Sequence, residues 1–106
     1  KLLEKVINLR IFEDEQGRFQ YSLLQIGGEL MVVSQFTLYA DARKGRRPSF
    51  ERAERPERAK ELYEFFVKEA KKRLPKVETG VFGANMEVKL VNYGPVTILL
   101  DTEELK

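Results

Sequence analysis

The sequence predicts a mixed α and β protein in which one long helix packs against a β-sheet. Three observations support this class. Residues 56–74 have the apolar periodicity of a helix, short stretches of alternating apolar and polar residues precede and follow them, and glycine or proline turns separate the stretches. The chain has 106 residues, of which 42% are hydrophobic and 34% charged. We therefore expect residues 1–106 to form one domain with a single core.

The first predicted elements are a short helix and a β-hairpin. Residues 1–7 read as the last two turns of an amphipathic helix, with no N-cap residue before them. Residues 9–13 and 19–25 alternate as strands, and the turn between them ends in a glycine that can adopt a positive φ. Gly27-Gly28 forms a second turn. The simplest arrangement is three consecutive antiparallel strands, the third beginning at Leu30.

This third predicted strand, residues 30–39, changes from apolar to polar along its length. It begins with Leu-Met-Val-Val, which is apolar on both faces and typical of a strand covered on both sides. Strand alternation then places Gln35 and Thr37 on one face and Ser34 on the other. Buried amide and hydroxyl groups need hydrogen-bond partners. They either bond backbone at the margin of the sheet or form part of a reaction site.

Residues 40–55 have the composition of an exposed loop. Arg43, Lys44, Arg46 and Arg47 lie around a glycine, and a proline follows. Such a run does not form the interior of a helix or strand. Residues 43–47, which we call the basic loop, are either a solvated surface loop or a contact to the phosphates of a nucleic acid.

The helix predicted for residues 56–74 has the strongest pattern in the chain. Pro56 suits its first turn, Pro75 ends it, and its lysines and glutamates face water. The apolar stripe predicted to face the core consists of Ala59, Leu62, Tyr63, Phe66, Val67, Ala70 and Leu74.

Three extended segments are predicted after this helix, at residues 77–82, 86–93 and 96–100. The second alternates as a strand with one exposed face, and the third is apolar and β-branched. Gly94-Pro95 separates them. Proline between strands is typical of a turn, and most X-Pro bonds are trans. The alternative is that the Gly-Pro unit fixes the direction of backbone carbonyls and distinguishes ligands by shape.

Two residue types are absent from the sequence, cysteine and histidine. Their absence excludes thiol nucleophiles, histidine-dependent triads and the usual zinc ligand sets. We expect no metal and no cofactor. No apolar run reaches membrane-spanning length, so we expect a cytosolic protein without a membrane partner. The formal net charge of +2 does not by itself indicate a nucleic-acid partner.

Ser34-Gln35-Phe36-Thr37-Leu38 and Asn92-Tyr93-Gly94-Pro95-Val96-Thr97 form a pair of unusual motifs. Together with residues 9–12, 45–50 and 79–84, they resemble the signature of the D-aminoacyl-tRNA deacylases, also called D-tyrosyl-tRNA deacylases. The resemblance covers almost the whole chain in family order, and the two motifs together are highly specific.

The resemblance implies a homodimeric hydrolase with layered, barrel-like curved β-sheets and helices outside. Members of the family cleave the ester that joins a D-amino acid, or glycine, to the 3′ end of tRNA, and so proofread chirality in translation. Family chains also carry an N-terminal β-hairpin before the point where this sequence begins. Two alternatives belong to other classes: a non-catalytic RNA-binding module that keeps the fold, and a structural dimerisation domain.

The resemblance also implies roles for the first motif. Ser34, Gln35 and Phe36 hold the carbonyl or α-amino group of the substrate, partly through backbone N–H groups. Thr37 is the nucleophile candidate by residue type, but no histidine, lysine or N-terminal amine lies near it in sequence to activate its hydroxyl. We therefore favour assistance by the 2′-OH of the terminal ribose, with Thr37 as a positioning group.

The resemblance implies a different role for the second motif. The Gly94-Pro95 bond would be cis and would reach into the pocket of the partner subunit, where its carbonyls exclude the side chain of an L-amino acid. Asn92 and Thr97 would support it. Phe82 and Met86 either line a pocket for the terminal adenosine or belong to the core. The basic loop becomes a contact to tRNA phosphates.

Overall fold

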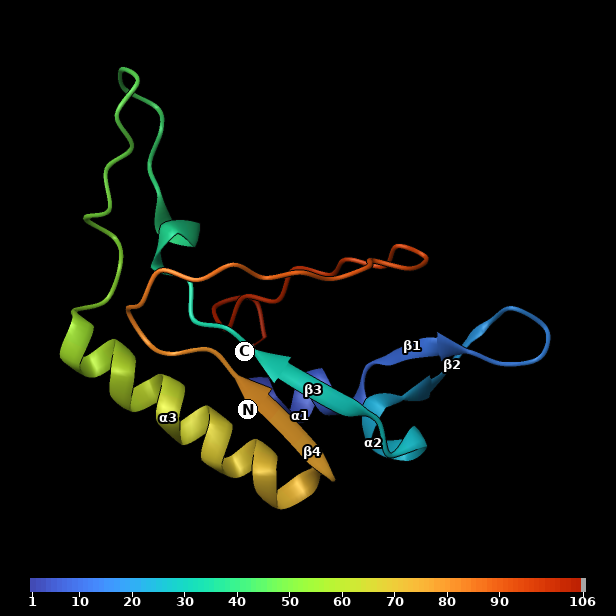
Figure 1. The fold of residues 1–106 in the computed structure, drawn as a ribbon. Coiled ribbons are helices and arrows are strands. Elements are labelled where there is room, and N and C mark those ends of the chain that lie inside the picture. The colour runs from blue at the N-terminus through green and yellow to red at the C-terminus, as the bar shows by residue number, and fades with distance from the viewer. Residues whose placement is uncertain (106) are drawn as a thin grey trace.

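The structure is a computed structural model that describes residues 1–105 (Figure 1). The elements in order are α1 (Leu2–Asn8), β1 (Arg10–Glu13), β2 (Phe19–Ser22), α2 (Leu23–Ile26), β3 (Glu29–Val32), the 3₁₀ helix η1 (Phe36–Tyr39), α3 (Pro56–Arg73) and β4 (Lys76–Thr79). The predicted mixed class is confirmed. Within residues 1–105 the strands form two separate two-stranded sheets and no closed barrel.

The predicted β-hairpin is confirmed in its first part. β1 and β2 are antiparallel, with Arg10 opposite Ser22 and Glu13 opposite Phe19. Gly17 has a φ of 78° and closes the turn, which the Asp14 carboxylate stabilises by accepting the N–H groups of residues 16 and 18 at 2.9 and 3.0 Å.

The prediction that this second strand continues to residue 25 is wrong, because α2 begins at Leu23. Ser22 and Gln25 form a capping box. The Ser22 hydroxyl accepts the Gln25 N–H at 3.1 Å, and the Gln25 side chain accepts the Ser22 N–H at 2.8 Å. These two bonds favour a helical turn over a strand. Gly27, with a φ of 62°, then ends α2.

The predicted order of three consecutive antiparallel strands is also wrong. β3 pairs with β4 in a parallel register that runs from Glu29 opposite Lys76 to Val32 opposite Thr79. The crossover through α3 supplies the long connection that a parallel pair requires. Within residues 1–105, β3 is covered on one face only, since Leu30 is half-buried and Met31 is exposed.

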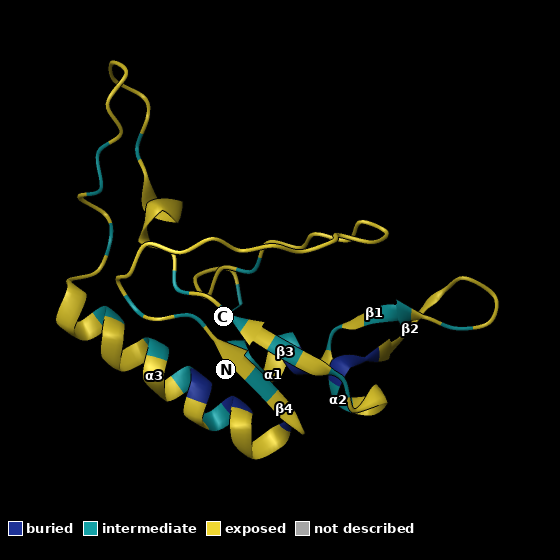
Figure 2. Ribbon diagram, in the orientation of Figure 1, coloured by how far each residue is buried: buried dark blue, intermediate teal, exposed yellow. Residues whose placement is uncertain are grey.

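α3 occupies almost the whole range predicted for the long helix (Figure 1). Val67, Ala70 and Leu74 are buried. The predicted stripe is too wide in one respect, because Leu62 is 48% exposed. The stripe of α3 that faces the rest of the chain is therefore narrower than the apolar pattern implies (Figure 2).

The core lies where α1, α2 and the C-terminal end of α3 meet. Ile7, Leu23 and Leu74 are buried there. The half-buried residues packed around them are Leu3, Phe12, Leu24, Leu30 and Val77. Short helices and strands thus form one core, because each contributes at least one apolar side chain to the same cluster. Among the described residues, no helix has both the length and the apolar composition needed to cross a membrane.

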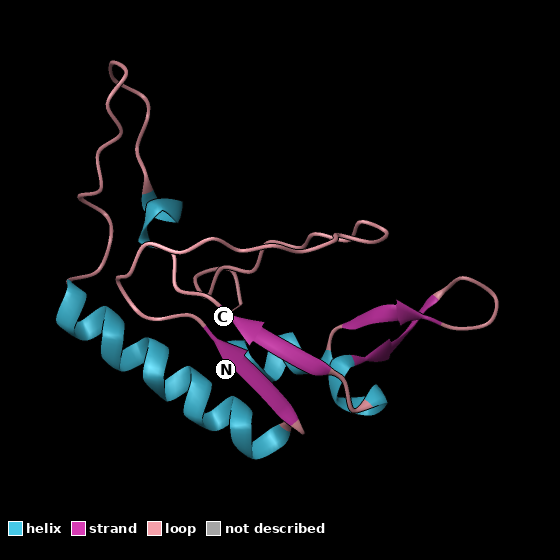
Figure 3. Ribbon diagram, in the orientation of Figure 1, coloured by secondary structure: helices cyan, strands magenta, loops and turns pink. Residues whose placement is uncertain are grey.

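Residues 84–100, which we call the arm, contain neither of the two strands predicted for this region (Figure 3). The segments at 86–93 and 96–100 are extended and mostly exposed, with Tyr93 95% exposed. An extended segment becomes a strand only when its N–H and C=O groups pair with a neighbour. Within residues 1–105, neither segment has such a ladder.

Candidate functional site

The two strands of the parallel pair end side by side, and Tyr63 of α3 closes that end. Its hydroxyl lies 3.2 Å from the Val32 carbonyl and 3.2 Å from the Gly80 carbonyl. The Gly80 N–H also donates to the Val32 carbonyl at 3.2 Å. The segments that leave β3 and β4, residues 33–40 and 80–86, therefore start from one common point, which we call the Tyr63 junction.

The first motif leaves this junction as a turn rather than a strand, so the predicted alternation of its side chains is wrong. β3 ends at Val32, and residues 36–39 form η1. The Ala40 N–H donates to the Thr37 carbonyl at 3.0 Å. Ser34 is half-buried and Gln35 is exposed. Gln35 and Thr37 are therefore exposed and Ser34 is half-buried beside the junction, and none of the three lies within a sheet.

Thr37 is exposed on η1. In residues 1–105, the hydrogen bonds of this helix are formed by backbone groups, and none brings a base to the Thr37 hydroxyl. A hydroxyl nucleophile needs an adjacent base or a lowered pKa. Within residues 1–105, the surroundings of Thr37 therefore supply no such base.

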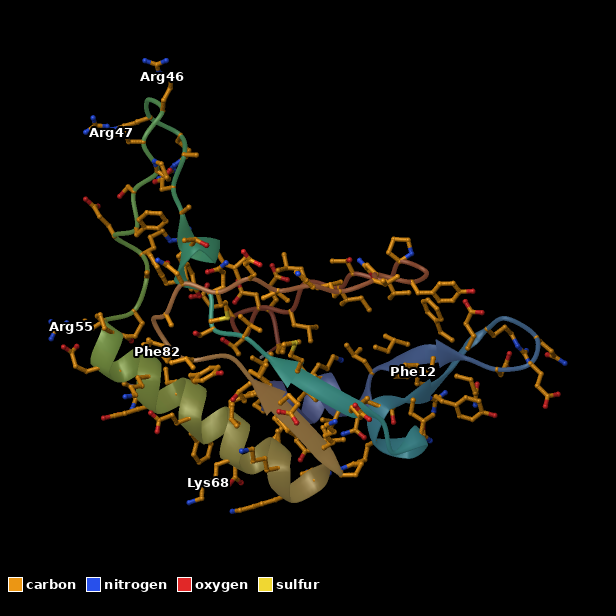
Figure 4. The ribbon with its side chains drawn as sticks, in the orientation of Figure 1. Phe12, Arg46, Arg47, Arg55, Lys68 and Phe82 are labelled. Atoms are coloured by element: carbon orange, nitrogen blue, oxygen red, sulfur yellow. The ribbon has the colours of Figure 1, made fainter. Side chains whose placement is uncertain are left out.

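Phe82 and Met86 lie at the same junction. The rings of Phe82 and Tyr63 have centroids 5.8 Å apart, and Phe82 lies beside α3 in Figure 4. A Cβ added at Gly80 would lie 2.7 Å from the Met86 sulfur, so Met86 covers this glycine closely. Phe82 is half-buried and Met86 is 40% exposed. The structure thus brings both predicted adenosine contacts near the first motif, with part of their surface free.

The second motif lies elsewhere. The Gly94-Pro95 peptide bond is cis, and Gly94 has a φ of 124°. Asn92, Gly94, Pro95 and Thr97 are all exposed. Their turn forms the far end of the arm, drawn in orange-red in Figure 1, well away from η1. One chain therefore does not bring the two motifs together.

The basic loop lies at the tip of the long loop between η1 and α3, and Arg46 and Arg47 point away from the rest of the chain (Figure 4). Arg43, in contrast, is held by an ion pair. Its Nε and Nη2 donate to the Asp41 carboxylate at 2.9 and 2.7 Å, and its N–H donates at 3.0 Å. These bonds lower the pKa of Asp41 below its ordinary value and raise the pKa of Arg43. Lys44, Arg46 and Arg47 form no ion pair within residues 1–105.

Two shallow hollows on the surface contain none of the predicted site residues. One lies along α1 beside Leu105, and the other lies along α3 between Tyr63 and Lys72. The hollow along α3 reaches Tyr63 and Thr79, and the convergent segments and hydrogen bonds define the rest of the Tyr63 junction.

Comparison with known proteins assigns the family. The model of the family described as D-Tyr-tRNA(Tyr) deacylase matches residues 1–101. The chain belongs to this family. The D-aminoacyl-tRNA deacylase of Aquifex aeolicus (strain VF5) is 65% identical to this deacylase chain over 105 residues, which cover 99% of the chain and 71% of that protein. The D-aminoacyl-tRNA deacylase of Syntrophus aciditrophicus (strain SB) is 62% identical over 104 residues, with coverages of 98% and 70%.

A solved structure has the same fold. The c-Myc DNA Unwinding Element Binding Protein superposes on the deacylase chain with a TM-score of 0.84 and 39% sequence identity, covering 94% of this chain and 68% of that one. The predicted resemblance to the D-aminoacyl-tRNA deacylases is confirmed by the family model and by these relatives.

Three residues of the deacylase chain beside the first motif or its junction have no site role predicted from the sequence. Tyr63 belongs to the predicted core stripe, although a tyrosine hydroxyl in such a stripe needs a polar partner at its end. Tyr39 and Arg52 form the second contact, with the Arg52 guanidinium carbon 5.9 Å from the centroid of the Tyr39 ring. The spacing of Phe36 and Tyr39, three residues apart, was the sequence signal for a shared face in a tight turn.

Proposed function

We propose that the deacylase reaction of this chain, hydrolysis of the ester between a D-amino acid and tRNA, takes place at the Tyr63 junction. One observation carries this proposal. The Tyr63 hydroxyl lies within hydrogen-bond distance of both the Val32 and Gly80 carbonyls, so the segment of the first motif and the segment of Phe82 are held at one point. Catalytic groups need such positioning by a rigid scaffold.

The reaction adds water across an ester that is already activated. The bond between the acyl carbon and the ribose oxygen breaks, the amino acid leaves as a carboxylate, and the ribose regains its hydroxyl. Backbone N–H groups of Ser34, Gln35 and Phe36 would stabilise the oxyanion that develops on the acyl oxygen. The 2′-OH of the terminal ribose would orient the attacking water, and Thr37 would position the ribose. The exposed polar groups of the motif support this division of roles.

Thr37 provides a direct test of the RNA-assisted mechanism. We expect Thr37→Ala to retain measurable hydrolysis of D-aminoacyl-tRNA, and Thr37→Ser to lie between Thr37→Ala and the wild type. A substrate whose terminal ribose lacks the 2′-OH should react much more slowly with all three proteins. If Thr37→Ala abolishes turnover while substrate binding is intact, Thr37 is the nucleophile and the RNA-assisted mechanism is wrong.

The complete site would be formed by two copies of the chain. Gly94-Pro95 lies far from the first motif of its own chain (Figure 1), and the arm that carries it exposes Leu90, Val91 and Leu99 to solvent. A second copy that packs on the arm would cover these side chains and receive Gly94-Pro95 at its Tyr63 junction. The backbone carbonyls there would leave room for glycine or a D-amino acid and exclude an L side chain, supported by Asn92 and Thr97.

Mixing two inactive variants tests the shared site. We expect Gln35→Ala to remove the side-chain amide that would hold the α-amino group of the substrate, and Gly94→Leu to fill the space of the substrate in the partner. A dimer with one copy of each variant has one site in which both halves are wild type. Unfolding and refolding the two variants together should therefore restore part of the activity. The full-length protein should sediment as a dimer. If mixing the two variants restores no activity, the cross-subunit site is refuted.

Substrate scope follows from the same geometry. We expect rapid loss of the D-aminoacyl ester, loss of glycyl-tRNA, and survival of the L-ester. Glycine has no side chain for the Gly94-Pro95 carbonyls to exclude. Because charged tRNA is made and used where translation occurs, we place this activity in the cytoplasm. If the full-length protein hydrolyses neither ester, a non-catalytic RNA-binding or dimerisation role replaces the proposal.

The basic loop would bind phosphates of the tRNA. Three of its cations, Lys44, Arg46 and Arg47, are exposed and form no ion pair within residues 1–105. We expect the double variant Arg46→Glu with Arg47→Glu to weaken tRNA binding and to reduce the slope of log K against log salt by about 1.4, at roughly 0.7 per phosphate contact on a single strand. The double variant Lys68→Glu with Lys71→Glu, at exposed positions of α3 that form no ion pair within residues 1–105, is the matched control. An unchanged salt slope would exclude the loop from the interface.

A further inference from the structure

Two aromatic rings lie in a row on η1. In a 3₁₀ helix, side chains three residues apart are eclipsed, and Phe36 and Tyr39 are the first and last residues of η1. Both rings are accessible, with Phe36 60% and Tyr39 50% exposed. Exposed aromatic rings that lie together are candidates for contact with a ligand or a partner.

The opposite limb of the loop braces this row. The Phe50 ring packs edge-to-face on Phe36, with centroids 5.0 Å apart, and the Arg52 guanidinium lies over the Tyr39 ring. A two-bond bridge between Asp41 and Ser49, at 2.7 and 2.9 Å, joins the two limbs just beyond the rings. These contacts limit the orientations of the rings, and the Arg52 guanidinium covers one face of Tyr39.

A half-exposed aromatic ring with an arginine over one face can stack an unpaired base on its other face, and the arginine can bind the adjacent phosphate. The order of these residues along the loop also indicates the direction in which a bound RNA strand would run. Thr37 comes first, Tyr39 next, and Arg46 and Arg47 lie at the tip (Figure 4). A strand whose 3′-terminal ester lies at Thr37 would therefore pass Tyr39 before it reaches the basic loop.

We propose that Tyr39 and Arg52 form a binding site for the nucleotide that precedes the terminal adenosine of the tRNA, with its base stacked on the face of the Tyr39 ring opposite Arg52. This proposal rests on the placement of the reaction at the first motif. Stacking here would hold the single-stranded 3′ end against the loop and so orient the ester toward Ser34 and Thr37. Since every base has a face that can stack, the site would be tolerant of sequence.

A fluorescent RNA tests the stacking without the reaction. The probe is an uncharged acceptor-stem hairpin that carries 2-aminopurine in place of the nucleotide before the terminal adenosine, because the fluorescence of 2-aminopurine falls when it stacks. We expect the full-length wild-type protein and Tyr39→Phe to quench the probe, and Tyr39→Ala to bind it about 5- to 150-fold more weakly with the quenching lost. Arg52→Gln should weaken binding while retaining quenching. Tyr21→Ala, which removes a ring 43% exposed on β2, should behave as the wild type.

Kinetics supply the second measurement. Tyr39→Ala should raise the KM for D-aminoacyl-tRNA far more than it changes kcat, and it should lower the preference for this substrate over a D-aminoacyl ester of adenosine alone. If Tyr39→Ala perturbs folding, Tyr39→Leu keeps the bulk of the side chain without the ring. Quenching that survives loss of the ring, or a bound probe that is never quenched, overturns the proposal. If the wild-type protein does not hydrolyse D-aminoacyl-tRNA at all, the proposed function itself is wrong.

Discussion

Tyr63→Phe isolates the hydrogen bonds of the Tyr63 junction. The substitution removes the hydroxyl that lies 3.2 Å from the Val32 carbonyl and 3.2 Å from the Gly80 carbonyl. It keeps the ring, and with it the contact to Phe82. No cavity is created, so the measured change reports the lost hydroxyl rather than lost packing.

The expected loss of stability is about 1 kcal/mol, within the range of roughly 0.5–1.5 kcal/mol for a net hydrogen bond. It should not be larger, because the Val32 carbonyl still accepts the Gly80 N–H. A loss of this size lowers the Tm by about 4–8 °C in a domain of about 100 residues. We also expect kcat/KM for D-aminoacyl-tRNA to fall, by up to about 100-fold if the first motif moves by about 1 Å.

Thermal unfolding and steady-state deacylation of the full-length protein measure the two effects. Tyr21→Phe is the matched control, because it removes a tyrosine hydroxyl from the exposed face of β2. Equal shifts in the two variants would mean that the Tyr63 hydroxyl has no special role. Unchanged stability and unchanged turnover in Tyr63→Phe would refute the view that this side chain holds the two segments together.

Three further predictions concern the core, the capping box and a titrating carboxyl. Ile7 is fully buried, so Ile7→Ala should cost about 2–5 kcal/mol in denaturant unfolding, and a loss below 1 kcal/mol would contradict its central place in the core. Ser22→Ala should cost about 1 kcal/mol, and Ser22→Gly only a few tenths; equal losses would argue against the capping bond to Gln25. Because the Arg43 side chain lowers the pKa of Asp41, their ion pair should be fully formed at neutral pH and lost as the pH falls through that lowered pKa. An NMR titration should place the pKa of Asp41 below 3.8, and Arg43→Ala should raise it; an identical curve in the variant would contradict the cause.

The sequence by itself determined the elements whose signals lie within a few residues. Pro56, the apolar stripe and Pro75 predicted α3, because helix periodicity and helix ends are local properties. Gly17 predicted the hairpin turn in the same way. The two motifs also identified the family without any structure, since they are short and specific. The capping box of Ser22 and Gln25 was equally local, and it could have corrected the predicted strand at α2.

Only the tertiary structure decided which distant segments meet. β3 pairs with β4 across the α3 crossover. The sequence of neither strand specifies this partner, because every residue except proline offers the same backbone hydrogen-bonding groups. For the same reason, the strand-like patterns of the arm form no ladder within residues 1–105. The ends of β3 and β4 then place the Tyr63 hydroxyl between two carbonyls. The residues of the candidate site could thus be predicted one motif at a time, whereas the meeting of the segments after β3 and β4 at Tyr63 depends on packing between parts far apart in the chain.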